Sequence, residues 1–109
     1  MAIAPEDVRL HSSCPDVARA VSEPVLLALG ARAGLDVSRL DELVLALGIA
    51  IASAVPGPVT TDLRRAGGSV SVTVYPVAHD RLAGRRTLLE GLAASVVADG
   101  DAVALTVDA

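Results

Sequence analysis

The sequence has no lysine, phenylalanine or tryptophan, and it has one tyrosine, one cysteine and one methionine among 109 residues. A single cysteine excludes an internal disulfide. The near absence of aromatic side chains removes the stacking surfaces on which single-stranded nucleic-acid binders depend. A net charge of −4 and a pI near 4.9 also argue against a basic surface that binds nucleic acid. We therefore expect an aliphatic core and no nucleic-acid partner.

Long hydrophobic runs are missing as well. The longest uncharged stretch of a predicted helix, residues 43–55, has thirteen residues, fewer than the roughly 18 that a membrane span needs. Residues 1–10 show no basic segment followed by an apolar one, so they do not read as a signal peptide. We expect a cytoplasmic protein that makes no membrane contact.

The length suits one domain with one core, which we assign to residues 1–109. Hydrophobic periodicity predicts seven elements in the order β-α-α-β-β-α-β. This order predicts an α+β fold with a four-stranded mixed sheet and the helices on one face. The predicted strands are 7–13, 59–65, 69–75 and 102–107, and the predicted helices begin near 15, 38 and 85.

The first predicted helix has clear start and stop signals. Ser13 is the expected N-cap with Asp16 at the capping-box position, and Gly34 suits the residue just beyond the C-terminus. Pro24 is expected to kink or divide the helix. The stripe predicted to face the core consists of Val17, Val21, Val25, Ala28 and Leu29.

A second capping box, Ser38 to Asp41, is expected to open the next helix. Two apolar sides follow it, which is unusual for a helix at the surface of a small domain. Leu45, Ile49 and Ala52 lie on the second side, which is either covered by collapse of neighbouring chain or left open as a groove for a ligand or partner. We favour collapse, because burial in the core is the usual fate of such apolar stripes. The first side consists of Leu40, Leu43, Val44, Leu47, Ile51 and Ala54.

The remaining segments complete the prediction. Residues 66–68, Ala-Gly-Gly, read as a hairpin between two strands. Residues 75–86 read as a polar crossing, and a third helix is expected from Arg85 to Val97. That helix would bury Leu88, Leu89, Leu92 and Val96, and residues 98–101 would turn the chain into its last strand.

Three segments and the order of elements resemble the histidine-kinase-like ATPase fold, in particular the small anti-sigma-factor serine kinases of the GHKL superfamily. The first, PDVARAVSEPVLLALGARAGL, resembles the family's first helix. The second, LDELVLALGIAIASAV, is similar to the helix that carries its N-box. The third, TLLEGLAASVVADGDAVALTV, resembles its closing helix, turn and strand, so the resemblance covers nearly the whole chain.

The functional residues that this resemblance implies are mostly absent. The N-box glutamate, a general base, and the asparagine that holds magnesium align with Ile49 and Ser53. Isoleucine cannot accept a proton, and a serine hydroxyl is a poor ligand for a hard cation. Asp80 is the one candidate for the adenine contact, and few residues remain for an ATP lid. We therefore expect a fold that has lost its ATP site, with no cofactor and no catalytic residue.

Other candidate sites are weaker. Cys14 at the first turn of a helix is placed where thiolate chemistry is favoured, but His11 and His79 are isolated, and an incidental cysteine is the simpler interpretation. His11, Cys14 and His79 match no strong metal-ligand spacing. Two arginine pairs, 64–65 and 85–86, could meet an acidic partner or phosphate, or could simply aid solubility.

Two classes of function remain from the sequence. The resemblance implies a non-catalytic regulatory module that binds a sigma factor or an anti-anti-sigma-like protein, and that forms a homodimer. Arg19, Glu23 and Arg32 on the first helix are the candidate partner contacts. The alternative is a ferredoxin-like small-molecule sensor domain, or a weak residual nucleotide-binding serine kinase.

Overall fold

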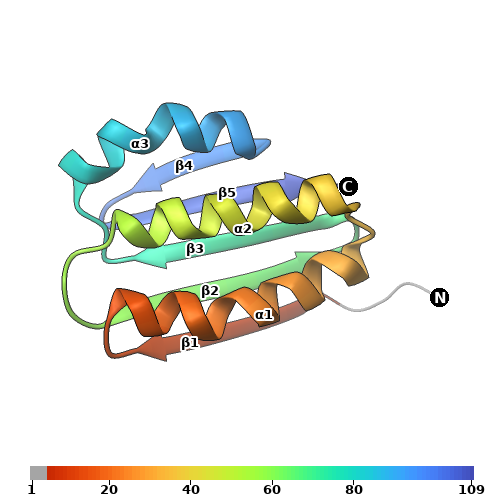
Figure 1. Ribbon diagram of the computed structural model, residues 1–109, viewed down its shortest axis with the longest axis horizontal. Coiled ribbons are helices and arrows are strands. Elements are labelled where there is room, and N and C mark those ends of the chain that lie inside the picture. The colour runs from red at the N-terminus through yellow and green to blue at the C-terminus, as the bar shows by residue number, and fades with distance from the viewer. Residues whose placement is uncertain (1–4) are drawn as a thin grey trace.

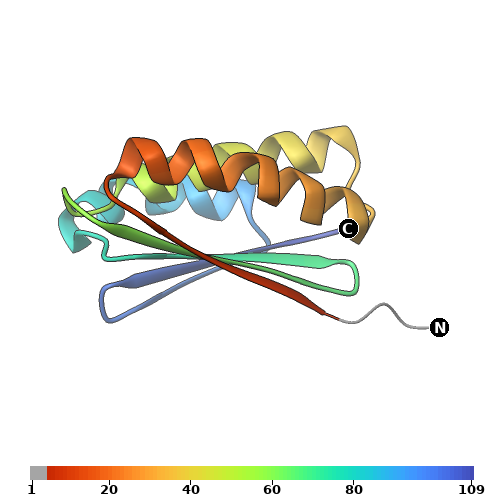
Figure 2. The same cartoon turned by 90° about the horizontal axis from the view of Figure 1, so that it is seen from below.

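The computed structural model describes residues 5–109. Within these residues, three helices cover one face of an antiparallel five-stranded sheet, and no other described element covers its other face (Figures 1 and 2). The strands lie side by side in the order β1-β2-β3-β5-β4. The elements are β1 (Glu6–Ser12), α1 (Pro15–Ala33), α2 (Val37–Ala52), β2 (Val59–Ala66), β3 (Ser69–Tyr75), α3 (His79–Leu92), β4 (Ser95–Asp99) and β5 (Ala102–Asp108).

The α+β class and the strands predicted from alternation are confirmed. In β2, β3 and β5, every second side chain is buried under the helices, as the alternating pattern requires. A two-residue turn joins β2 to β3, where Gly67 takes a positive φ of 59° that glycine adopts at no steric cost.

The predicted four-stranded mixed sheet is wrong, because there are five strands and every pair is antiparallel. The additional strand is β4, whose residues we expected to end the third helix. Residues 98–101, expected to link a helix to a strand, instead supply the last two residues of β4 and the two-residue turn of the β4–β5 hairpin. Gly100, with a φ of 58°, provides the tight turn.

The third helix begins earlier than predicted, at His79 rather than Arg85, and ends at Leu92. Only Leu82 and Leu89 of this helix are fully buried. They are seven residues apart with charged side chains between them, so the segment 79–86 reads as a polar loop in sequence. Leu88, expected in the core, is 61% exposed, and Val96 belongs to β4.

The core lies between the helical layer and the sheet, and all its apolar side chains are aliphatic. Gly30 lets α1 and α2 approach closely, since a Cβ there would lie 2.5 Å from Leu40 Cδ2. The largest fully buried apolar side chains are Leu26, Leu43, Leu47, Leu63, Leu89, Leu105, Val59, Val70, Val72, Val74 and Val103.

The face of α1 that we predicted to be buried is largely exposed. Val17 is 42% exposed, Val21 is 41% exposed, and Ala28 is also exposed. The helix carries two apolar stripes because it has few charges, and periodicity alone does not say which one meets the sheet. The buried stripe consists of Ala18, Ser22, Leu26, Leu29, Gly30 and Ala33.

The helix ends also differ from prediction. Cys14, not Ser13, occupies the N-cap of α1 and makes no side-chain cap bond, and the helix continues through Pro24 without interruption. Gly34 adopts the left-handed conformation, as expected for its position. The N-cap of α2 is Asp36, whose Oδ1 accepts from the Arg39 N–H at 2.9 Å, so the Ser38 capping box does not form.

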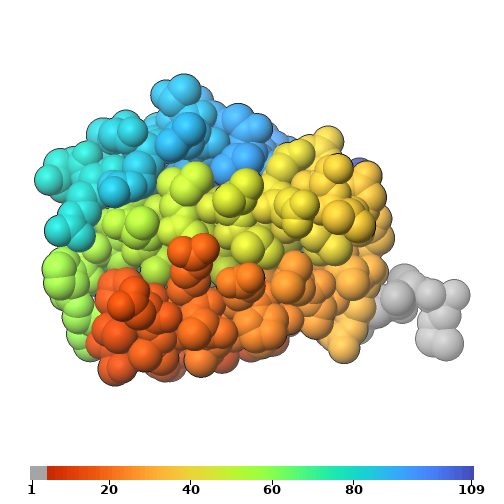
Figure 3. Space-filling view, viewed as in Figure 1, coloured from red at the N-terminus to blue at the C-terminus, as the bar shows by residue number. Residues whose placement is uncertain are grey.

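The second apolar side of α2 is neither fully covered nor a deep groove. Leu45 is 55% exposed and Ala52 is exposed, so the collapse that we favoured over them does not occur. Ile49 is half-buried and packs against the core. In the space-filling view the three helices form adjoining bands (Figure 3).

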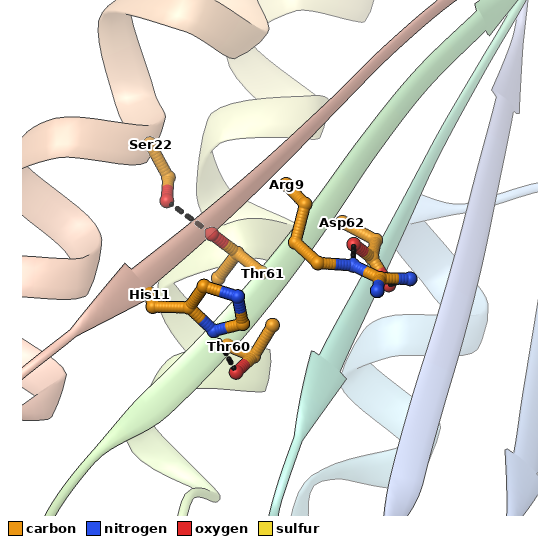
Figure 4. A network of polar contacts seen from close by, with 6 residues as sticks. All are labelled: Arg9, His11, Ser22, Thr60, Thr61 and Asp62. Carbon is orange, nitrogen blue, oxygen red and sulfur yellow. Dashed lines mark hydrogen bonds and ion pairs between the residues drawn. The ribbon is translucent and has the colours of Figure 1, made fainter.

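Two polar pairs lie under α1. Ser22 and the buried Thr61 of β2 share a hydrogen bond of 2.8 Å, which satisfies two hydroxyls that the core would otherwise leave unpaired (Figure 4). Arg65, 1% exposed, donates from Nε to Glu6 Oε1 at 2.8 Å. Arg32 of α1 donates to the other oxygen of Glu6. Glu6 thereby links β1, β2 and α1.

Acidification should weaken this link. The hydrogen bond from Arg65, aided by the charge of Arg32, holds the Glu6 pKa below its ordinary value of 4.5. A carboxyl group with a lowered folded-state pKa contributes stability above its unfolded pKa, and this contribution is lost as the pH falls through the folded value. We expect the melting temperature, followed by circular dichroism, to fall more steeply below pH 4.5 in the wild type than in Glu6→Gln. Parallel curves would contradict this assignment.

Candidate functional site

The C-terminal end of α2, the start of α3 and the start of α1 meet at one end of the molecule (Figure 1). This is the end where the resemblance places the N-box. The three segments surround a shallow cavity of about 370 Å³. Its lining comprises Cys14, Pro15, Asp16, Ile51, Ala52, Ala54, Pro56, Gly57 and Arg81.

The two N-box positions take part in packing rather than facing this cavity. Ser53 is fully buried, and its hydroxyl donates to the carbonyl of Ile49 at 3.0 Å, one turn earlier in α2. This bond uses the serine proton within the helix. Ile49 packs against the core from the side of α2. Neither residue presents an ionisable group.

Backbone hydrogen bonds tie the end of α2 to the connection between β3 and α3. The Val55 N–H donates to the Pro76 carbonyl at 2.9 Å, and the Ala78 N–H donates to the Ser53 carbonyl at 2.8 Å. Ala54 and Val77 form a bridge between these two bonds. We call this set of contacts the α2–α3 closure. It fills the space between the two helix ends with main chain.

Side chains and the β4–β5 turn reinforce the α2–α3 closure. Arg81 donates from Nη1 to the Ala54 carbonyl at 3.1 Å, and the Val77 N–H donates to the Asp101 carbonyl at 2.7 Å. Asp80, the predicted adenine contact, is exposed in the first turn of α3. A carboxylate there interacts favourably with the helix dipole, which gives Asp80 a structural role.

The cavity itself has little catalytic chemistry. Asp16 and Arg81 bring opposite charges to its lining, and Cys14 adds a half-buried thiol. His11 lies on the open face of the sheet, where its Nδ1 shares a 2.9 Å hydrogen bond with Thr60 (Figure 4). His79 is exposed at the start of α3. In residues 5–109, no three histidine, cysteine or acidic side chains gather as metal ligands.

The three predicted partner contacts do not share one surface. Arg19 lies against α2, since a Cβ at Gly48 would be 3.3 Å from its Cζ. Glu23 is half-buried four residues further along α1. Arg32 instead points to β1, where it pairs with Glu6. The structure therefore separates Arg32 from the other two.

The arginine pairs are also divided. Arg64 is exposed on the open sheet face, whereas Arg65 is buried under α1. Arg85 donates to the Arg81 carbonyl, and Arg86 pairs with Glu90 and reaches the Val96 carbonyl of β4. Arg65, Arg85 and Arg86 thus contribute to packing or hydrogen bonding within the fold. Strand alternation could have predicted the burial of Arg65, because this residue lies on the same face of β2 as Val59, Thr61 and Leu63.

Two glycine-bearing loops, residues 33–36 and 65–69, are the ones that would approach a ligand in the sensor alternative, and they lie at the opposite end from the cavity (Figure 1). A Cβ at Gly68 would be 3.7 Å from the Ala33 carbonyl oxygen, so the β2–β3 turn contacts the end of α1. These loops therefore do not approach the cavity. No helix in the described residues is long and apolar enough to cross a membrane.

Comparison with known proteins adds no relative: no protein-family profile and no curated protein matches this chain.

Proposed function

We propose that this chain is a non-catalytic regulatory module that binds a protein partner and is similar to an anti-sigma factor without its ATP site. The α2–α3 closure is the observation that carries the proposal. Main chain from Ser53, Val55, Pro76 and Ala78 occupies the region between the two helix ends. A nucleotide there would have to break these hydrogen bonds, each of which satisfies a backbone group.

The short connection after β3 supports the same conclusion. Only residues 76–78 separate the end of β3 from the start of α3. An ATP lid needs a longer loop that can fold over bound phosphates, as glycine-rich phosphate loops do. Here the connection is held at both ends by backbone hydrogen bonds. The segment therefore fixes α3 against α2.

The outer surface of the helical layer supports a protein partner. Leu27, Leu45 and Leu88, one on each helix, expose between 37% and 61% of their surface. We take these exposed aliphatic side chains of the helical layer as support for a protein partner, because uncovered apolar surface marks interaction sites where it is contiguous. Arg19, Glu23 and Leu27 are spaced by four residues, so they share one side of α1, and Arg19 lies against α2. We propose a sigma factor or an anti-anti-sigma-like protein as the partner, with homodimers as the assembled form.

A calorimetric titration tests this proposal. We expect no heat of binding when ATP or ADP is added to the wild type, with or without magnesium. We expect measurable binding when the source's own sigma factors and anti-anti-sigma proteins are titrated one by one. The combined variant Arg19→Glu and Glu23→Arg should weaken that binding at least about tenfold, as reversing interface charges does.

The matched control is Arg86→Glu with Glu90→Arg, which makes the same exchange on α3, away from α1. This variant should bind the partner as the wild type does. Micromolar binding of ATP would contradict the proposal and would require the α2–α3 closure to open. Failure of every sigma factor and anti-anti-sigma protein to bind would contradict the assignment of partner.

The small-molecule sensor is the second candidate, and the cavity of about 370 Å³ is the observation in its favour. Its polar lining is limited to opposite charges on Asp16 and Arg81 and the thiol of Cys14. The five-stranded sheet also differs from the four strands that this alternative requires. We rank it below the protein-binding module for these two reasons.

A further inference from the structure

Helix α1 exposes an apolar stripe along the side of the molecule where β1 forms the edge. Val17, Val21, Val25 and Ala28 are spaced by four, four and three residues, so they share one side of the helix. Arg32 continues this stripe one turn later and pairs with Glu6 of β1. The stripe therefore runs beside β1, and Val17 and Val21 remain 42% and 41% exposed.

Strand β1 is the outer strand on this side of the sheet and has a neighbour, β2, on one side only within the described chain. Its inward side chains Val8 and Leu10 are half-buried, because no strand lies beyond them to complete the core. We call β1 together with Val17, Val21, Val25 and Ala28 the β1 flank. A row of backbone donors and acceptors beside an apolar helix is a template for a further strand with its own apolar cover.

The charges on the open face of β1 favour a second copy of this chain as the partner that binds there. Asp7, Arg9 and His11 alternate along that face. In an antiparallel pair of identical strands related by a two-fold axis normal to the sheet, directly opposed residues lie on the same face. Centring the pair on Val8 places Asp7 opposite Arg9 of the second copy, and this contact occurs twice.

The neighbouring registers are less favourable. Centring on Arg9 brings Asp7 opposite His11, but it also places two arginines opposite each other, and centring on Asp7 does the same for two aspartates. Like charges directly opposite each other are destabilising. Centring on Leu10 places Arg9 opposite His11, which adds no attractive charge contact between the copies. Arg9 already donates Nε and Nη2 to Asp62. A guanidinium has five donors, so Arg9 can also meet Asp7 of a second copy.

We propose that two copies associate through the β1 flank, with β1 pairing antiparallel to β1 about Val8. The two sheets become one continuous sheet, and the α1 stripes of the two copies cover each other. This inference deepens the protein-binding role proposed above and rests on it. It names a second copy as one partner and assigns it a surface distinct from that of Arg19 and Glu23.

Charge exchange between copies tests the register. Asp7→Arg and Arg9→Asp should each be monomeric or dissociate at least about tenfold more readily than the wild type, because each variant opposes like charges twice. An equimolar mixture of the two variants should recover a dimer, since every introduced charge then faces its complement. Light scattering and sedimentation measure the mass, which should be twice 11.0 kDa for the wild type and for the mixture.

Two further variants serve as controls for the charge exchange. Asp99→Arg makes the same charge change at β4, the other edge of the sheet, and should remain dimeric. Val21→Arg should abolish the dimer through the α1 stripe without touching β1. Circular dichroism confirms that each variant is folded, which matters for Arg9→Asp because it also loses the Asp62 pair.

A monomeric wild type, or variants that do not recover a dimer when mixed, would overturn this inference. Either result would leave the proposed binding of a sigma factor or anti-anti-sigma protein untouched, although a monomeric wild type would also contradict the homodimer proposed with it. ATP binding, in contrast, would contradict the proposed function without affecting the measured mass. The two failures are therefore distinguishable.

Discussion

Arg65→Ala should lower the free energy of unfolding by about 3 kcal/mol, while Arg64→Ala should change it by no more than about 0.5 kcal/mol. The two residues are adjacent in β2 but face opposite sides of the sheet. Arg65 is 1% exposed, and its stem is packed under α1 like that of a core residue. Removing it loses that packing together with the hydrogen bonds to Glu6 and to the Gly67 carbonyl. Urea denaturation followed by far-UV circular dichroism measures both changes.

Arg65→Met separates packing from charge. Methionine fills a similar volume, and Glu6 is 29% exposed and keeps its contact with Arg32, so the substitution leaves no unpaired charge buried. We expect Arg65→Met to recover more than half of the stability that Arg65→Ala loses. Equal losses in the two variants would show that the ion pair with Glu6, rather than the buried stem, accounts for the effect. Equal stability of Arg64→Ala and Arg65→Ala would contradict the burial of Arg65.

Leu47→Ala should lower the free energy of unfolding by about 3 to 4 kcal/mol. Leu47 is fully buried where α2 meets the sheet. The surrounding core contains only aliphatic side chains and close-packed glycine at Gly30. A core of this kind has little freedom to relax around a missing isopropyl group, so a cavity remains. The same urea titration measures the loss.

Leu45→Ala is the matched control, because it is the same substitution two residues earlier in α2. Leu45 is 55% exposed, so we expect a change within about 0.5 kcal/mol. A loss at Leu45 comparable to that at Leu47 would mean that the second side of α2 is covered in solution. That result would restore the collapsed arrangement that the sequence favoured.

The strands were predictable where alternation is strong. In β3 and β5, every second residue is apolar and the intervening residues are mostly small or polar, so the period of two stands out. In β2, Val59 and Leu63 keep the same period, although Thr61 and Arg65 share their face. β4 was missed because Val96 and Val97 are adjacent, which hides alternation in a strand of only five residues. The leucines at 88, 89 and 92 then extended the helical pattern across it.

The helices were predictable in existence but not in orientation. In α1 the small residues Ala18 and Ser22 face the sheet and Gly30 faces α2, whereas the larger Val17 and Val21 face outward. Hydrophobicity alone ranks the valine stripe as the core side. Close approach of α1 to α2 and to β2 requires the small residues instead, and such an approach is a property of the packed structure that no local pattern contains.

The lack of a general base and a magnesium ligand in the candidate site was predictable from the sequence. Isoleucine and serine at positions 49 and 53 already excluded a base and a magnesium ligand. The α2–α3 closure was not predictable, because it consists of backbone hydrogen bonds between segments more than twenty residues apart, from Val55 to Pro76 and from Ala78 to Ser53. Side-chain types carry no information about bonds of this kind.

The placement of the only tyrosine makes the α2–α3 closure observable without a label. Tyr75 ends β3 and is half-buried, and the next residue, Pro76, accepts the Val55 N–H. Because the chain has no tryptophan, its intrinsic emission comes from this one ring. Emission recorded during denaturation therefore reports on the closure, while far-UV dichroism reports on the whole sheet and helical layer. A fluorescence transition that precedes the dichroic one would mark the closure as a separately opening unit of the fold.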